Sequence, residues 1–406
     1  MKYFDIPSPC YVLEEDKFKH NLDILNLVRS ASKAKILLAL KGYAFWRSFD
    51  IARDYLDGCC ASGIYEALLA FEEFGGREVQ KDICVFSPAY KDCEIDLLLP
   101  IATHIIFNSF AQWQKFKDKI KIKNKQLDSL GLCKIEVGLR VNPLYSEVEP
   151  PIYNPCIPGS RLGIVPSEFQ RGLEEFGLEG IDGLHFHTHC EQNSDALKRT
   201  LEHFKKHFGD YISKMKWINF GGGHHITRID YDVDKLICIL KDFKNSYSDV
   251  DIFLEPGEAV GWQSGFLIGE VVDIIYNEMN VAILDVSAAA HMPDCLEMPY
   301  RPNVKKISIN DINGDELIEE DKGIGVGKYI YRFGGPTCLA GDVIGEYSFD
   351  TPLNIGDRIL FEDMMHYTIV KNNTFNGVPL PSLGTIRDEK FVLLKSFEYM
   401  DYKNRN

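Results

Sequence analysis

The sequence predicts an α/β barrel of the eight-stranded β/α type, followed by a mostly β C-terminal domain. Short apolar runs alternate with longer amphipathic segments over residues 31–265, and eight of these runs look like strands. Alternation of strands and helices indicates a parallel sheet, and eight parallel strands close a barrel. The chain has 406 residues, which is enough for a barrel plus a second domain.

The expected barrel strands are short apolar runs. A helix at about 15–29 precedes the first of them. The region 142–165 is proline-rich and too long for an ordinary connection, so we expect a functional loop over the barrel mouth. The eight strands are expected at 36–40, 59–61, 83–86, 104–107, 134–141, 181–186, 217–220 and 251–254.

Helix-like segments lie between these strands, and two glycines suggest where such helices end. Gly75 and Gly209 stand where helix C-caps belong, because glycine adopts the left-handed conformation that closes a helix. Three of the expected helices lie in the ranges 62–75, 195–209 and 231–245.

The pattern changes after residue 265, where β-like segments with Gly and Asp turns replace the alternation. This predicts a mostly β second domain. We therefore expect an N-terminal segment 1–30 that joins the β domain and the barrel, a barrel over 31–265 and a β domain over 266–406. The β-like segments are 266–276, 281–287, 328–335, 342–349, 357–363 and 367–372.

Composition excludes several classes of protein. The net charge is −15, and the basic run at 117–125 has the spacing of a solvated helix face, so nucleic acid is not an expected partner. Neither a secretory signal nor an apolar run of membrane-spanning length is found, so we expect a cytoplasmic protein without a membrane partner. The 11 scattered cysteines indicate reduced thiols rather than disulfides or a zinc site.

Chemistry in such a barrel gathers at the C-terminal ends of the strands. Lys41 directly follows the apolar run 36–40. A lysine at a strand end usually extends to solvent or forms a salt bridge. A buried lysine, however, has a lowered pKa and becomes a nucleophile that forms Schiff bases.

Three histidines alternate at the end of the sixth strand. His185, His187 and His189 lie on one face if the strand continues through them, which leaves two interpretations open. They could bind zinc with Cys190 or Glu191, or one of them could be functional and the other two structural.

The seventh and eighth strands end in further polar or glycine-rich segments. Gly221, Gly222 and Gly223 precede an expected helix, which suits a backbone that approaches an anion at a helix N-terminus. Glu255 is followed by proline and glycine, so a stiff turn carries its carboxylate into the mouth.

Together these residues fit pyridoxal phosphate. Lys41 forms the Schiff base, an imidazole stacks on the ring, the glycines hold the phosphate and Glu255 pairs with the pyridinium nitrogen. A carboxylate at that nitrogen keeps it protonated, which makes the ring a strong electron sink for a carbanion. No metal is required in this interpretation.

The segments LLALKGYA, GLHFHTHCE, NFGGG and EPGE resemble the motifs of the fold-type III pyridoxal phosphate decarboxylases, which include ornithine and diaminopimelate decarboxylases. In the C-terminal domain, GGPTCLAGD and MMHYTIVKNNTFNG resemble two further motifs of that family. The resemblance implies that His187 stacks on the ring and that Cys338 protonates the carbanion. It implies that Tyr367 contacts phosphate or substrate, and that a homodimer shares its two active sites across the interface.

Departures from the family pattern resemble a narrower branch, the carboxynorspermidine (carboxyspermidine) decarboxylases of bacterial polyamine synthesis. Glu258 stands where the family has arginine, Leu339 where an acid is usual and Cys59 where ornithine enzymes have aspartate. A polyamine substrate is long and cationic and needs carboxylates away from the reacting carbon. Candidate substrate contacts are Glu258, Asp294 and Asp342.

Rival hypotheses remain. Diaminopimelate decarboxylase would want an arginine for the distal carboxylate, and Arg301 and Arg332 are the nearest possibilities. A racemase usually pairs the pyridine nitrogen with arginine, which Glu255 disfavours. A non-catalytic homologue would be expected to lose Lys41 or Cys338. The two polyamine substrates differ by one methylene, worth only about 1–3 kcal/mol in a pocket, so both are expected to react.

Overall fold

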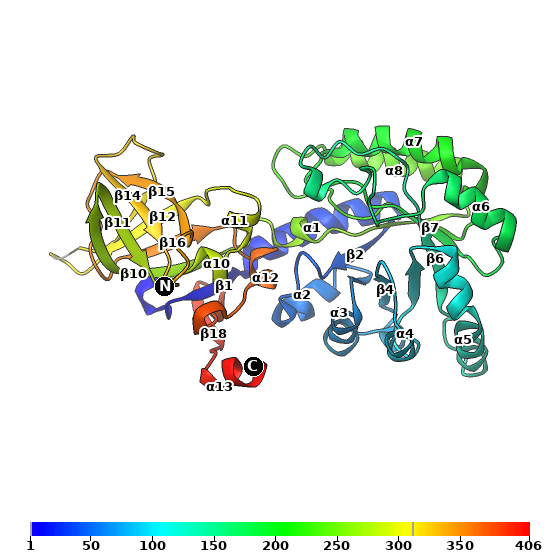
Figure 1. The fold of residues 1–406 in the computed structure, drawn as a ribbon, viewed down its shortest axis with the longest axis horizontal. Coiled ribbons are helices and arrows are strands. Elements are labelled where there is room, and N and C mark those ends of the chain that lie inside the picture. Colours follow the sequence, from blue (N-terminus) through cyan, green and yellow to red (C-terminus); the bar gives the residue numbers. More distant parts are fainter. Residues whose placement is uncertain (1, 311) are drawn as a thin grey trace. The chain divides into compact units, whose positions relative to one another are not determined.

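A closed barrel of parallel strands forms one of the two units into which the chain divides (Figure 1). The computed structural model describes residues 2–310 and 312–406. The barrel unit is Asn21–Val260, and the second unit combines the residues up to His20 with Gly261–Asn406. The domain boundaries expected from the sequence, after residues 30 and 265, stay predictions.

The predicted barrel is confirmed. Each expected strand is present, and each pairs in parallel with its neighbours until the last strand meets the first. In chain order the barrel strands are β2 (Lys35–Ala39), β3 (Gly58–Ala61), β4 (Asp82–Phe86), β5 (His104–Phe107), β6 (Glu136–Arg140), β7 (Gly183–His185), β8 (Trp217–Asn219) and β9 (Asp251–Leu254).

Trp217 fills the barrel interior near the N-terminal ends of the strands. A Cβ atom at Gly138 or Gly183, on the two preceding strands, would clash with its indole ring. The rings of His104 and Phe253 meet the indole edge-on at 5.5 and 5.8 Å. Because this level of the barrel is packed, the opposite, C-terminal ends of the strands are left for a binding site.

The helices of the barrel unit follow the predicted alternation, with one misplaced end. Gly75 has φ +100° and ends a helical segment, as predicted. Gly209 does not end its helix: α7 continues to Ile212, because Phe208 and Ile212 prolong the buried apolar face. The helices are α1 (Glu15–Ser32), which begins in the other unit, and α2 (Phe49–Arg53), α3 (Ile64–Leu69), α4 (Asp92–Leu98), α5 (Phe110–Ser129), α6 (Pro166–Phe176), α7 (Ser194–Ile212), α8 (Val233–Ser246) and α9 (Glu258–Gly261).

The second unit contains a ten-stranded sheet within the described residues. Most of it follows in the order β13-β12-β16-β10-β1-β17-β18, and β11, β14 and β15 continue from β10. The strands are β1 (Cys10–Glu14), β10 (Gly265–Asn277), β11 (Met279–Leu284), β12 (Val304–Ile309), β13 (Glu316–Glu320), β14 (Tyr329–Gly334), β15 (Val343–Phe349), β16 (Arg358–Glu362), β17 (Ser382–Arg387) and β18 (Lys390–Lys395).

The predicted β character of this unit is confirmed, except for the segment 367–372. That segment forms α12 (Thr368–Lys371), and Tyr367 before it lies in a turn with φ +41°. The other helices of this unit are α10 (Ala288–His291), α11 (Asp294–Glu297) and α13 (Tyr399–Arg405). Across both described ranges, every helix is too short or too polar to cross a bilayer.

Candidate active site

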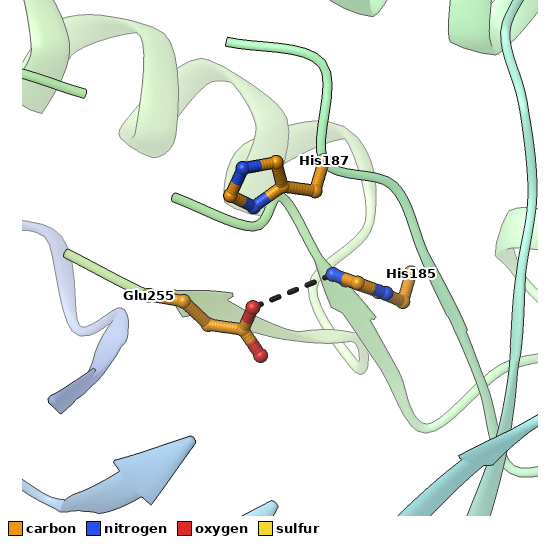
Figure 2. A group of neighbouring side chains, drawn as sticks. All are labelled: His185, His187 and Glu255. Atoms are coloured by element: carbon orange, nitrogen blue, oxygen red, sulfur yellow. Dashed lines mark ion pairs between the residues drawn. The ribbon is translucent and has the colours of Figure 1, made fainter. Parts of the chain in front are cut away.

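Glu255 lies directly after β9 and forms the buried centre of the site. Its side chain is 4% exposed. Asn219 Nδ2, at the end of β8, donates a hydrogen bond of 2.6 Å to Glu255 Oε1. The other oxygen, Oε2, lies 3.4 Å from His185 Nε2 at the end of β7, and Figure 2 shows this approach as a dashed line.

These neighbours keep the Glu255 carboxylate charged. Burial by itself raises the pKa of Glu255, but His185, Asn219 and Cys60 outweigh burial and lower it to about 2. Burial lowers the pKa of His185 below its ordinary value. At neutral pH the site therefore holds an ionised carboxylate, which is what a protonated ring nitrogen needs as a partner.

His187 is oriented by the glycine segment. The backbone N–H of Gly222 donates to His187 Nδ1 at 2.9 Å. Burial, with Lys41 and Arg140 nearby, lowers the pKa of His187 well below its ordinary value. Since Nδ1 accepts a hydrogen bond, the proton of the neutral ring is on Nε2. Figure 2 shows the rings of His187 and His185 near the Glu255 carboxylate.

The glycine segment after β8 has no room for side chains. A Cβ atom at Gly221, Gly222 or Gly223 would lie closer than 3.0 Å to a backbone oxygen of a neighbouring strand end. Gly221 and Gly223 also have φ +70° and +80°, which favour glycine. The helix expected after the glycines is present as α8, but it begins only at Val233 and not directly behind Gly223. An anion here would therefore meet loop N–H groups rather than a helix N-terminus.

Lys41 follows β2 and shares one side of the barrel mouth with Glu258. A Cβ atom at Gly42 would lie 3.0 Å from the Glu258 backbone nitrogen, and a Cβ atom at Gly257 would lie 2.9 Å from the Ala39 carbonyl oxygen. Two glycines thus let the backbone after β2 touch the backbone after β9. The contact places the backbone of Glu258 against Gly42, the residue that follows Lys41.

The pKa of the Lys41 amine is lowered, which favours nucleophilic chemistry. Its side chain reaches solvent, yet enough protein surrounds it that desolvation lowers the pKa of the ammonium, and Arg140 lowers it further. A lowered pKa raises the fraction of neutral amine at neutral pH, and the neutral amine is the form that attacks an aldehyde.

Two residues of this site were missed in the sequence. Arg140 ends β6, stacks over the Phe86 ring at 4.5 Å and donates to the His187 carbonyl oxygen at 3.2 Å. Burial lowers its pKa to about 10, so it is still a cation at neutral pH. Asn219 is fully buried and joins Glu255 to the glycine segment. A polar residue at the end of an apolar strand was the available signal for both.

Two groups in the barrel unit have metal-ligand geometry, and each differs from the histidine triplet considered above. His185, His187 and Glu255 form one group whose ligand atoms all lie within 4.8 Å of one another, and Glu191, His225 and Glu258 form the other. His189 belongs to neither group. In the first group, Asn219 and Gly222 already orient Glu255 and His187 by hydrogen bonds. This arrangement suits the binding of an organic ring as well as that of a metal ion.

Four predicted site residues lie in the second unit and are described within it. Cys338 is exposed, and its N–H donates to Asn376 Oδ1 at 3.0 Å. Asp294 forms an ion pair with Lys371. Tyr367 is half-buried before α12.

Asp342 is the most enclosed residue of these four. It is 4% exposed and accepts hydrogen bonds from the Ser287 hydroxyl at 2.9 Å and the Thr337 hydroxyl at 2.7 Å. The N–H of Ala289 donates to it at 3.1 Å. These bonds tie the turn that carries Cys338 to the start of α10.

An eight-stranded barrel with a lysine after β2, a glycine cradle after β8 and an ionised glutamate after β9 defines an enzyme of the pyridoxal phosphate class. The family model described as "Pyridoxal-dependent decarboxylase, C-terminal sheet domain" matches residues 10–365. The chain therefore belongs to the pyridoxal-dependent decarboxylases, and the predicted family, cofactor and enzyme class are confirmed.

Two curated relatives match along nearly their whole length. The chain is 47% identical over 408 residues to the carboxynorspermidine/carboxyspermidine decarboxylase of Campylobacter jejuni, with 100% of both chains covered. It is 41% identical to the carboxyaminopropylagmatine decarboxylase of Synechocystis sp., covering 98% of this chain and 95% of the relative.

Solved structures agree on the fold. The carboxynorspermidine decarboxylase from Campylobacter jejuni complexed with norspermidine has a TM-score of 0.85 and 44% identity, covering 99% of this chain and 100% of that one. A diaminopimelate decarboxylase from Helicobacter pylori has a TM-score of 0.78 at 17% identity, over 98% of this chain and 96% of that one, and supports the fold alone.

The residues present fit the cofactor of this family. The ionised Glu255 suits a protonated ring nitrogen, and the glycine segment suits a phosphate that must approach the backbone closely. The lowered pKa of Lys41 suits attachment of the cofactor aldehyde. His187, held by Gly222, presents a neutral ring for stacking.

Proposed function

We propose that the chain decarboxylates carboxynorspermidine or carboxyspermidine, yielding norspermidine or spermidine in polyamine biosynthesis. The observation that carries the proposal is Glu258, an acid whose backbone nitrogen lies against Gly42, the residue that follows Lys41. An acid at this place suits a substrate that carries ammonium groups beyond its reacting carbon. Full-length relatives that act on such substrates support the same substrate class.

Bound pyridoxal phosphate supplies an electron sink for the electron pair that the departing carboxylate leaves behind. Lys41 would offer the amine that holds the cofactor, and the same amine would serve the release of product. Glu255 holds the proton on the ring nitrogen, since it stays ionised. The glycine segment, which has no room for side chains, would let the phosphate approach the backbone closely, and His187 would cover the ring face.

Substrate recognition is proposed to rest on carboxylates. Glu258 meets an amine of the substrate, and Asp294 is a second candidate whose present ionic partner is Lys371. Asp342, also expected to bind substrate, is buried and accepts several hydrogen bonds, which supports a role as anchor of the Cys338 turn instead.

We also propose a cytoplasmic homodimer in which Cys338 and Tyr367 of one chain complete the barrel site of the other. The free thiols of all 11 cysteines agree with a reducing compartment. Mixing Lys41→Ala and Cys338→Ala chains tests the shared site. More activity in the mixture than in either variant alone supports it, and no gain contradicts it.

A second candidate substrate follows from the Synechocystis relative, which is a carboxyaminopropylagmatine decarboxylase. That molecule ends in a guanidinium, which a carboxylate binds with two parallel hydrogen bonds. Diaminopimelate is the less supported alternative, because a diaminopimelate decarboxylase relative matches only 52% of this chain at 26% identity.

The test is carbon dioxide release from carboxynorspermidine, carboxyspermidine, carboxyaminopropylagmatine, meso-diaminopimelate and ornithine. Preferred release from the first two supports the proposal. Preference for the agmatine derivative shifts the assignment to the second candidate, and release from diaminopimelate or ornithine alone overturns both. Glu258→Gln is expected to raise KM for the preferred substrate about tenfold or more, whereas Glu179→Gln at an exposed site leaves it unchanged.

A further inference from the structure

The fully buried amide of Asn219 lies between the two parts of the cofactor site that bind opposite ends of pyridoxal phosphate. Asn219 Nδ2 donates to Glu255 Oε1 at 2.6 Å, and Asn219 Oδ1 accepts the N–H of Gly221 at 2.8 Å. The side chain is 0% exposed. Both ends of the amide are therefore used, and both partners belong to the cofactor site.

The orientation of this amide follows from its partners. The Gly221 N–H is a donor, so an oxygen must face it, and the ionised Glu255 accepts only, so a nitrogen must face it. A flipped amide would oppose donor to donor and acceptor to acceptor. The orientation is thus fixed without reference to the hydrogen atoms.

We propose that Asn219 is a positioning residue that couples the carboxylate for the ring nitrogen to the glycine segment for the phosphate. Through its two hydrogen bonds, a movement of the glycine segment is passed to the Glu255 carboxylate. The proposal rests on the cofactor and not on the substrate suggested above, so it stands or falls independently of the substrate panel.

A matching link runs on the other side of the glycine segment. The Gly222 N–H donates to His187 Nδ1, so adjacent glycines hold the residue for the ring face and, through Asn219, the residue for the ring nitrogen. The three cofactor contacts are therefore parts of one hydrogen-bonded unit. Removing Asn219 is therefore expected to weaken both the contact to the ring nitrogen and the contact to the phosphate.

Other charged or titratable groups also face Glu255, and the test must separate Asn219 from them. Each of these groups comes from a different barrel strand or from the loop that follows it. They are Lys41, Cys60, Cys84, Arg140 and His185.

Two substitutions separate the role of Asn219 toward Glu255 from its role toward Gly221. Asn219→Ala removes both hydrogen bonds, whereas Asn219→Asp keeps an acceptor for the Gly221 N–H but replaces the donor to Glu255 with a second carboxyl group. The control is Asn124→Ala, since Asn124 also uses both ends of its amide, donating to the Ile135 carbonyl oxygen at 2.9 Å and accepting its N–H at 2.7 Å. It lies on α5, away from the cofactor residues.

The readouts are the affinities of the full chain for pyridoxal phosphate and for pyridoxal, and the pH dependence of the bound cofactor's absorbance. Asn219→Ala is expected to weaken pyridoxal phosphate binding at least about tenfold. Loss of a donor raises the pKa of Glu255, so the acid-side absorbance change should move up by about one pH unit. Asn219→Asp should alter the pH profile while keeping the wild-type preference for pyridoxal phosphate over pyridoxal.

The control Asn124→Ala should change neither the affinity ratio nor the pH profile. If the absorbance of the bound cofactor changes at the same pH in Asn219→Ala and Asn219→Asp as in the wild type, Asn219 is a packing residue and the proposal is wrong. It is equally wrong if Asn219→Ala keeps the wild-type preference for pyridoxal phosphate over pyridoxal, because the amide would then not hold the glycine segment.

Discussion

Replacing Glu255 with glutamine tests whether its neighbours hold the buried carboxyl group in its charged form. Glutamine keeps the size of the side chain and an oxygen that accepts the hydrogen bond from Asn219, but it has no charge at any pH. A difference in pH dependence between the two proteins therefore reports the ionisation of this one group.

The expected magnitude follows from the pKa. Burial raises the pKa of Glu255, but its neighbours lower it from 4.5 to about 2 in the folded chain. A group with a lowered folded-state pKa contributes stability above pH 4.5 and loses it as the pH falls toward 2. Linkage gives a loss of about 2 kcal/mol between pH 7 and pH 3, out of about 3 kcal/mol in all.

The measurement is urea unfolding of the cofactor-free protein at several pH values from 7 to 3, since bound cofactor would add its own pH dependence. Tryptophan fluorescence follows mainly the barrel unit, which contains Trp46, Trp113 and Trp217. Glu179→Gln is the control, because that glutamate is 88% exposed.

The wild-type protein should lose about 2 kcal/mol more than Glu255→Gln over this range, and Glu179→Gln should follow the wild type. Equal losses in wild type and Glu255→Gln would refute the reasoning, because the neighbours would then not favour the charged form. A steeper loss in Glu255→Gln would mean that the wild-type carboxyl group is neutral when folded.

Four further predictions concern single residues. Lys41→Ala should abolish covalent attachment of the cofactor on borohydride reduction, and peptide mapping that still finds a labelled lysine elsewhere would contradict the assignment. Gly222→Ala places a Cβ atom against the Glu255 carbonyl oxygen, and the overpacking of about 1–3 kcal/mol should weaken cofactor binding about tenfold or more in a fluorescence titration. Cys338→Ala should leave that affinity unchanged but lower kcat, so an unchanged kcat argues against proton donation. Asp342→Ala leaves several buried donors without a partner and should cost about 1–3 kcal/mol in urea unfolding, whereas Asp342→Asn should recover part of it.

The barrel and most of its site could be predicted because their signals are local. Each strand is an apolar run, and Lys41 and Glu255 directly follow such runs. Asn219 and Arg140 each stand as a polar residue at the end of an apolar strand, but that signal does not reveal their partners, which is why both were missed. Their partners lie 36 and 47 positions away, and only the closed barrel brings them together.

The wrong predictions came from local signals that longer-range packing overrode. Gly209 resembled a helix cap, but burial of Phe208 and Ile212 continues α7 beyond it. The β-branched residues in 367–372 indicated a strand, yet that segment forms α12 after the left-handed Tyr367. The strands β1, β12, β13, β17 and β18 were not predicted. β13, for example, is mostly acidic and largely exposed, so it lacks an apolar run.

The position of β1 has a consequence for synthesis on the ribosome. β1 pairs with β10 on one side and with β17 on the other, and Thr385 Oγ1 donates to the Leu13 carbonyl oxygen, 372 positions away. At about 5–20 residues per second, β17 emerges about 20–70 s after β1. The barrel segment is continuous and can fold in the meantime. Cys10–Leu13 is fully buried in the finished sheet, but its backbone N–H and C=O groups have no strand partner until β10 and β17 are made. β1 is thus made early and completed late, and its edge stays open to misassociation until β17 has been made.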